Sequence, residues 1–171
     1  MMPGEDNAIQ LELLKMRHAH RLEQFELANR EFFASRISDR GDDYFANFGD
    51  RLAALVAEND ARKSLFFVLI APTGRIVGRV NIADIDQPDV TELGFRIDAG
   101  VQGKGVATRG VRAALQIARE HGVRSITARV ALDNLASHRV VQRCGFAAMG
   151  LVDAPPGSNR TFMGYRIVLS D

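Results

Sequence analysis

A glycine-rich segment, Ile97 to Thr108, constrains the fold most, because it joins an apolar strand pattern to the start of a long amphipathic helix pattern. The first backbone N–H groups of a helix have no partner inside the helix, and the helix dipole adds partial positive charge there. Gly103 and Gly105 let the backbone approach a ligand without interference from a Cβ atom. The segment therefore predicts an anion site, of the kind that most often holds phosphate.

The spacing of this segment disfavours two common phosphate loops. A Walker loop requires Gly, four residues and then Gly-Lys-Ser or Gly-Lys-Thr, but Gly100 stands three positions before Gly103, and Lys104 is followed by Gly105. A Rossmann fingerprint requires a further Gly or Ala at position 108, which is Thr, and an acidic residue about 20 positions on, which is missing. ATP and NAD are therefore not the expected ligands.

The hydrophobic patterns on both sides of the segment predict the fold class. Before it we expect these strands and helices in chain order: strand 9–16, helix 20–33, helix 42–58, strand 65–71, strand 76–84 and strand 90–97. After its start we expect helix 103–120, strand 125–130, helix 134–144, strand 146–152 and strand 161–169. Three hairpin-linked strands followed by a strand-helix-strand unit predict an α+β fold, with a mixed, mostly antiparallel seven-stranded sheet flanked by four helices.

Composition excludes several classes of protein. The 171 residues suit a single domain, 1–171, in which residues 1–8 are expected to form a disordered tail. A net charge of +1 with scattered arginines does not favour nucleic-acid binding. The longest apolar run, Leu65 to Ala71, is far shorter than the roughly 20 residues of a membrane span. One cysteine and unpatterned histidines predict no metal site. Without an export signal, a cytoplasmic protein is expected, and a homodimer stays open.

Three blocks together resemble one family. Residues 102–107 contain Gln-x-x-Gly-x-Ala, which resembles the pyrophosphate loop of the GNAT superfamily of N-acetyltransferases. Asp133 to Phe146 contains Asn-x-x-Ser and a final Gly-Phe, similar to the second block of that superfamily, and Val90 to Ile97 is similar to its cofactor-side strand. The resemblance covers roughly Ile9 to Leu169. It looks most like the branch that contains the Rim-type N-terminal acetyltransferases of ribosomal proteins.

The resemblance implies an acyltransferase that moves an acetyl group from acetyl-CoA directly to a primary amine, either a protein N-terminus or a small molecule. It implies a sheet that splays open between the fourth and fifth strands, and no metal. The residues it assigns to acetyl-CoA are Phe95, Arg96, Ile97, Gln102, Gly103, Lys104, Gly105, Val106, Ala107, Thr108, Asn134, Ser137 and Arg139. The alternative function is a CoA-binding sensor or interaction module without transferase activity.

The chemistry of amine acetylation points to two catalytic candidates. The amine must lose a proton, and Glu92, which precedes the segment Phe95 to Ile97 on the cofactor-side strand, is the candidate base. The departing thiolate needs a hydrogen-bond donor, and Ser137 is placed to supply it. Each candidate has an alternative: Glu92 could form an ion pair with Arg79 or Arg96, and Asn134 and Ser137 could each cap a helix.

The remaining polar residues near these blocks carry structural alternatives. Lys104 and Arg139 are each expected to be either a solvated surface charge or a contact to phosphate. His138 is expected to be an exposed helical side chain rather than a catalytic one. Cys144 falls on the apolar stripe of its helix and is expected to pack in the core.

Overall fold

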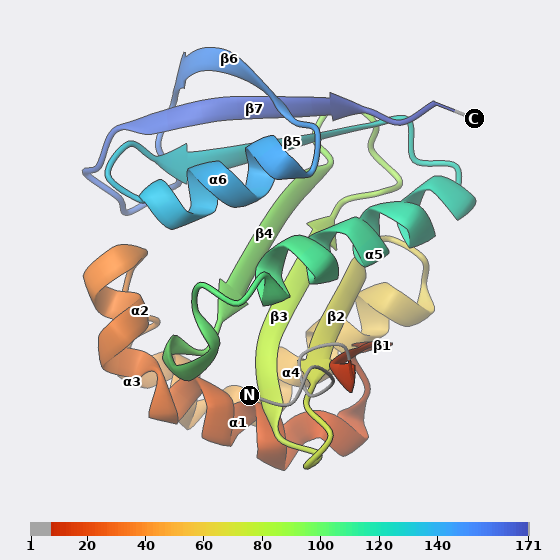
Figure 1. Ribbon diagram of the computed structural model, residues 1–171. Coiled ribbons are helices and arrows are strands. Elements are labelled where there is room, and N and C mark those ends of the chain that lie inside the picture. The colour runs from red at the N-terminus through yellow and green to blue at the C-terminus, as the bar shows by residue number, and fades with distance from the viewer. Residues whose placement is uncertain (1–7, 171) are drawn as a thin grey trace.

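The computed structural model describes residues 8–170, which form one seven-stranded sheet flanked by helices (Figure 1). The strands are β1 (Gln10–Leu13), β2 (Leu65–Ile70), β3 (Ile76–Ala83), β4 (Glu92–Ile97), β5 (Ser125–Ala131), β6 (Ala147–Val152) and β7 (Phe162–Val168). The helices are α1 (Ala19–Ala28), α2 (Arg30–Arg36), α3 (Asp42–Ala46), α4 (Phe48–Asp60), α5 (Val106–Glu120) and α6 (Leu135–Arg143). The strand order is β1-β2-β3-β4-β5-β7-β6, which confirms the predicted α+β class and strand number.

The expectation of four helices needs correction, because the described residues form six α-helices. Each of the first two expected helices is divided at an asparagine, Asn29 or Asn47, whose backbone leaves helical geometry (φ −106° and −114°). The Asn29 side-chain amide donates to the Phe25 carbonyl at 2.9 Å, and that of Asn47 donates to the Asp43 carbonyl at 2.9 Å. Side chains that bond to nearby backbone carbonyls in this way compete with the regular helical pattern.

Both faces of the sheet are covered, and each cover follows from the hydrophobic pattern. All six residues of β2 are buried, as expected for a central strand that is packed on both faces. Helices α5 and α6 pack on one face, while α1 and α4 pack on the other (Figure 1). The apolar stripe of α5 lies in the core of the first face, and Leu22 and Phe25 of α1 lie in the core of the second.

The sheet opens where the cofactor-side strand meets its next neighbour. Strands β4 and β5 are parallel and share only two register pairs, Glu92 with Thr127 and Leu93 with Ala128. Beyond these pairs the strands diverge, so β5 leaves the edge of β4 from Gly94 onward uncovered. The predicted splay between the fourth and fifth strands is confirmed.

Two further observations concern the expected N-terminal tail and membrane-spanning helices. The expected tail at residues 1–8 falls almost wholly on residues 1–7, which lie outside the described part of the chain. Within residues 8–170, none of the helices has the length and hydropathy that crossing a membrane requires.

Candidate active site

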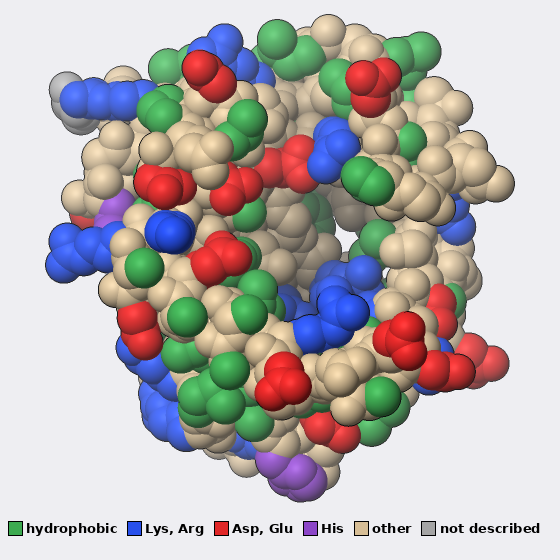
Figure 2. Space-filling view, turned by 180° about the vertical axis from the view of Figure 1, so that it is seen from behind, with side chains coloured by type: hydrophobic (Ala, Val, Ile, Leu, Met, Phe, Trp, Pro, Cys, Tyr) green, Lys and Arg blue, Asp and Glu red, His purple; other side chains and the backbone are tan. Residues whose placement is uncertain are grey.

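A cleft occupies the opening between β4 and β5. Its volume is about 720 Å³, within the range typical of small-molecule sites. Its lining includes Glu92, Phe95 and Arg96 from β4, Arg129 from β5, and Ser137 from α6. Figure 2 shows a hollow on this side of the molecule, with charged side chains around it. The splayed strands thus bring several of the predicted site residues to one cavity.

The open edge of β4 presents backbone groups to the cleft. The Asp98 N–H donates to the Val77 carbonyl at 2.9 Å, so residues at alternate positions of β4 bond to β3. Phe95 and Ile97 fall between those positions, and their backbone groups therefore point away from β3. The Ile97 carbonyl is occupied by the Gln102 side-chain amide at 2.9 Å. The Phe95 N–H and C=O remain directed into the opening, where an extended ligand segment could pair with them as a strand would.

The N-terminus of α5 has the features expected of an anion site. Gly103 and Gly105 both have φ +76°, a left-handed conformation that favours glycine. Gly105 is the N-cap residue, and no side chain caps the helix there. The first amides of this 15-residue helix are therefore not bonded to a capping side chain, and the helix dipole adds positive potential. This geometry fits the pyrophosphate that the sequence resemblance implies.

Helix α6 begins at the far wall of the cleft, and its first turn resolves one alternative. The Asn134 side-chain oxygen accepts from the Ser137 N–H at 3.3 Å, so Asn134 is the N-cap of α6. Ser137 contributes its backbone N–H to this cap and not its hydroxyl. Both residues line the cleft, so the cap also fixes where the Ser137 side chain begins.

Glu92 forms an ion pair, but with a residue that the sequence did not suggest. Its carboxylate oxygens lie 2.9 Å from Nη2 and 2.9 Å from Nε of Arg129. The alternative pairing with Arg79 or Arg96 is wrong, because Glu92 lies opposite Ala83 in the β3–β4 register and Arg79 pairs with Glu26. Arg129 lies two residues beyond Thr127, the register partner of Glu92, and so faces the same side of the sheet. The hydrogen bond from Nη2 and the ion pair with the same guanidinium fix the carboxylate at the cleft.

His138 is half-buried and hydrogen-bonded on both ring nitrogens, and is not the exposed helical residue that was expected. Its Nε2 lies 2.9 Å from the Ala131 carbonyl, which only accepts, so Nε2 carries the proton. Its Nδ1 lies 2.6 Å from the Tyr165 hydroxyl, and in the neutral imidazole with its proton on Nε2 it accepts from that hydroxyl. Tyr165 is 3% exposed, and its hydroxyl is engaged with His138. Ser137 stays the predicted donor to a leaving thiolate.

The structure separates the other cofactor residues into three groups. Gln102 and Ala107 line a small cavity that adjoins Phe95, Asn134 and Ser137. Val106 and Thr108 are buried, so only their backbone groups could reach a ligand. Three residues line neither cavity and are exposed to solvent: Gly103, Lys104 and Arg139.

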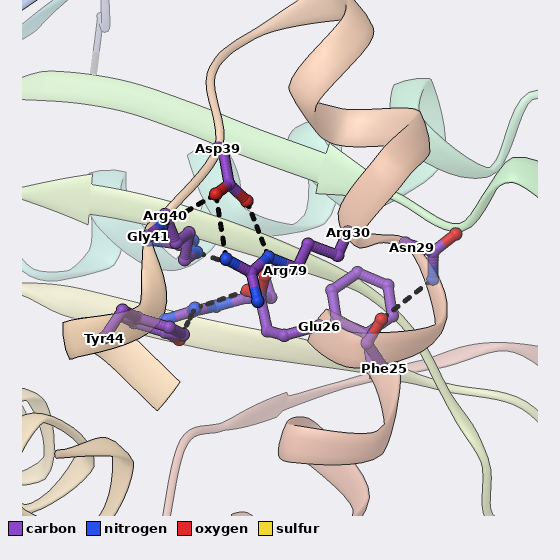
Figure 3. A network of polar contacts seen from close by, with 9 residues as sticks. All are labelled: Phe25, Glu26, Asn29, Arg30, Asp39, Arg40, Gly41, Tyr44 and Arg79. Carbon is purple, nitrogen blue, oxygen red and sulfur yellow. Dashed lines mark hydrogen bonds and ion pairs between the residues drawn. The ribbon is translucent and has the colours of Figure 1, made fainter. Parts of the chain in front are cut away.

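A buried polar network beside the cleft was missed by the sequence analysis. The Glu26 carboxylate of α1 is 1% exposed and contacts Arg79 of β3 and Arg40 of the α2–α3 loop (Figure 3). One signal was available: Glu26 continues the helical apolar stripe of Leu22 and Phe25, where a charged residue is unusual.

Comparison with known proteins finds one matching family and several structures with a similar fold. The family model described as acetyltransferase (GNAT) domain matches residues 10–147. No curated protein sequence matches the chain. Among solved structures, ribosomal-protein-S5-alanine acetyltransferase from Vibrio fischeri has a TM-score of 0.86 at 21% identity, covering 94% of this chain and 93% of that one. RimJ from Mycobacterium smegmatis, with a CoA disulfide, has a TM-score of 0.81 at 22% identity, covering 94% and 81%. Spermidine N-acetyltransferase from Vibrio cholerae, with CoA and spermine, has a TM-score of 0.76 at 18% identity, covering 95% and 96%.

Proposed function

The chain belongs to the GNAT acetyltransferase family and uses acetyl-CoA, and we propose that it acetylates the primary amine of a protein N-terminus or of a small molecule. The observation that carries this proposal is the opening of β4 from β5 directly beside the uncapped N-terminus of α5. The names of the similar structures include a ribosomal protein and spermidine as acceptors, which supports an amine acceptor of either size. Membership of an acetyltransferase family favours an enzyme over a CoA-binding sensor.

In this proposal three elements hold acetyl-CoA, which supplies an activated acetyl thioester when bound. The backbone of Phe95 pairs with the extended arm along the open edge of β4. The amides that follow Gly103 and Gly105 at the start of α5 hold the pyrophosphate. Asn134 and Ser137 at the start of α6 close the opposite wall of the cleft.

Two side chains assist the acetyl transfer in this proposal, Glu92 as a base and Ser137 as a hydrogen-bond donor. Glu92 takes a proton from the acceptor ammonium, directly or through a water molecule, because an ammonium has no lone pair for attack. Arg129 holds the Glu92 carboxylate at the cleft through contacts at 2.9 Å. Ser137 donates a hydrogen bond to the departing sulfur, and the Phe95 N–H is the candidate donor to the thioester oxygen.

We also propose a cytoplasmic location and leave a homodimer as a prediction. The single cysteine fits a reducing compartment, in which disulfides are rare. The edge strand β6 is exposed along its whole length and is the surface through which two copies could pair.

A thermal melt with acetyl-CoA, ATP or NAD tests the proposed cofactor. A ligand at 100 times its Kd adds about 2.7 kcal/mol, which for a chain of this size raises the melting temperature by roughly 5 to 10 °C. We expect this rise with acetyl-CoA alone. Gly105→Glu should abolish it, because the new carboxylate lies where phosphate binds.

The matched control is Gly122→Glu, at the other end of α5. Gly122 also has a positive φ, +84°, and a Cβ there meets no atom within 4 Å. This variant should keep the rise with acetyl-CoA. Loss of the rise in both variants, or in neither, would contradict the loop assignment. A rise without release of CoA in the presence of any primary amine would favour the sensor.

A further inference from the structure

Two arginines beside the cleft share one buried carboxylate. Glu26 accepts from Nη1 of Arg79 at 2.8 Å and from Nε of Arg40 at 3.1 Å. Burial by itself raises the pKa of Glu26, but the two arginines outweigh it and hold that pKa below its usual value. Glu26 is therefore ionised at neutral pH and contributes one negative charge. Arg79 and Arg40 together carry two positive charges, one more than Glu26 neutralises.

Arg96 adds a third positive charge that no acidic residue balances. It lies opposite Arg79 in the β3–β4 register, and its guanidinium stands 5.2 Å from the centre of the Phe33 ring. Burial and the neighbouring Arg40 lower the pKa of Arg96 to about 10, so it remains charged at neutral pH. Within residues 8–170, no carboxylate lies at ion-pair distance from it. The network thus holds an excess of two positive charges.

This excess faces the cleft and not the protein core. Arg96 and Arg40 line the cleft, and Arg36 at its rim stacks on Phe32 at 4.8 Å. The two acids that line the cleft are already engaged: Asp39 with Arg30 at 2.9 Å, and Glu92 with Arg129. We call Arg36, Arg40 and Arg96 the arginine pocket.

The residue between Glu92 and Arg96 on this face of β4 leaves room for a ligand. Gly94 is exposed, and a Cβ there would meet no atom within 4 Å. Asn81, its register partner on β3, has a buried side-chain oxygen without a hydrogen-bond partner. Glu92 and Arg96 are four residues apart, so their Cα atoms are separated by roughly 13 Å at the rise of an extended strand. The strand therefore offers an acid for an amine at one end and a cation at the other.

We propose that the arginine pocket binds a carboxylate of the acceptor. The enzyme would then acetylate the amine of molecules that also bear an acidic group several bonds from the amine nitrogen. The proposal rests on the acetyltransferase function proposed above. A planar guanidinium pairs with a carboxylate through two parallel hydrogen bonds, and a partly buried arginine without an acidic partner, here Arg96, favours an anion. The span along β4 suits an acidic residue at the second or third position of a peptide better than the α-carboxylate of a free amino acid. A polyamine such as spermidine, with several positive charges, is disfavoured by the same pocket.

The test compares matched acceptors. Three peptides share one sequence except for positions two and three, which are Asp-Glu, Asn-Gln or Lys-Arg after an N-terminal Ala; free glutamate and spermidine complete the set. We expect kcat/KM to be highest for the Asp-Glu peptide, by at least about tenfold over the Asn-Gln peptide. Arg96→Gln should remove that preference through KM, so that kcat/KM for the acidic peptide falls roughly 10- to 100-fold more than kcat/KM for the neutral peptide. Highest activity with free glutamate would place the carboxylate on a small molecule.

Two further variants separate this effect from loss of folding. Arg119→Gln makes the same change at an exposed position near the far end of α5 and should alter no rate. Arg36→Gln, at an exposed rim position, should lower the preference partly without a change in melting temperature. Equal kcat/KM for the three peptides in the wild-type enzyme would overturn the proposal.

The same peptides titrated in binding experiments distinguish this inference from the proposed function. No release of CoA with any acceptor would contradict the transferase function. Tighter binding of the acidic peptide to the wild type than to Arg96→Gln would still support the arginine pocket in that case. Equal binding of the acidic and neutral peptides would refute it.

Discussion

Replacing Glu26 by Gln tests how far one buried carboxylate stabilises the arginine-rich face of the sheet. Removing one partner of a buried ion pair costs about 3–5 kcal/mol, because the remaining charge is left uncompensated. The Arg40 side chain is 23% exposed and can recover part of its hydration, whereas that of Arg79 is 3% exposed and cannot. We therefore expect the lower end, about 3 kcal/mol.

The assay is thermal unfolding of the purified variant at neutral pH. For a chain of this size each kcal/mol changes the melting temperature by about 2–4 °C, so Glu26→Gln should lower it by about 6–12 °C. Asp39→Asn is the matched control, since Asp39 also pairs with an arginine, Arg30, but its side chain is 40% exposed. That variant should change the melting temperature far less. A fall of under about 2 °C for Glu26→Gln would refute the argument.

The pH dependence gives a second readout of the same residue. Burial acts to raise the pKa of Glu26, but Arg40 and Arg79 hold it below the ordinary value of 4.5. The carboxylate therefore contributes its full stabilisation above pH 4.5 and loses it as the pH falls through its folded-state pKa. The melting temperatures of the wild type and Glu26→Gln should converge in acid. A constant difference down to the lowest pH at which both remain folded would contradict this sign.

Two other predictions concern catalysis and packing. Glu92→Gln should lower turnover most at pH values where the acceptor amine is protonated, with acetyl-CoA affinity nearly unchanged. Arg129→Gln keeps the carboxylate and should retain more activity. Unchanged rates for Glu92→Gln in a pH series would make Glu92 structural. Gly110→Ala in α5 should cost about 1–3 kcal/mol in denaturant unfolding, because its Cβ would lie 2.9 Å from Leu69. Gly49→Ala in α4 meets no atom within 4 Å and should instead stabilise by about 0.5–1 kcal/mol, so equal effects would contradict the packing argument.

The fold was largely predictable because its signals are local. Alternating apolar residues in β5 and the helical stripe of α5 each report the face that an element buries, and the structure confirms both elements. The three blocks of motif residues also predicted the splay of the sheet, through resemblance to a family with that fold. The breaks at Asn29 and Asn47 were not predicted, since each depends on a side-chain contact with a backbone carbonyl.

The sequence by itself therefore determined the order of the elements, the glycines at the start of α5 and the family of the chain. Only the tertiary structure decided which charges meet: Arg79 and Glu26 are 53 residues apart, and Arg129 and Glu92 are 37 apart. Hydrophobic periodicity fixes which face of an element is buried, but ion pairs across strands depend on register and on how helices lie over the sheet. Arg96 is an ordinary arginine in the sequence, and it becomes an unbalanced charge at the cleft only because folding places Arg40 and Arg79 beside it.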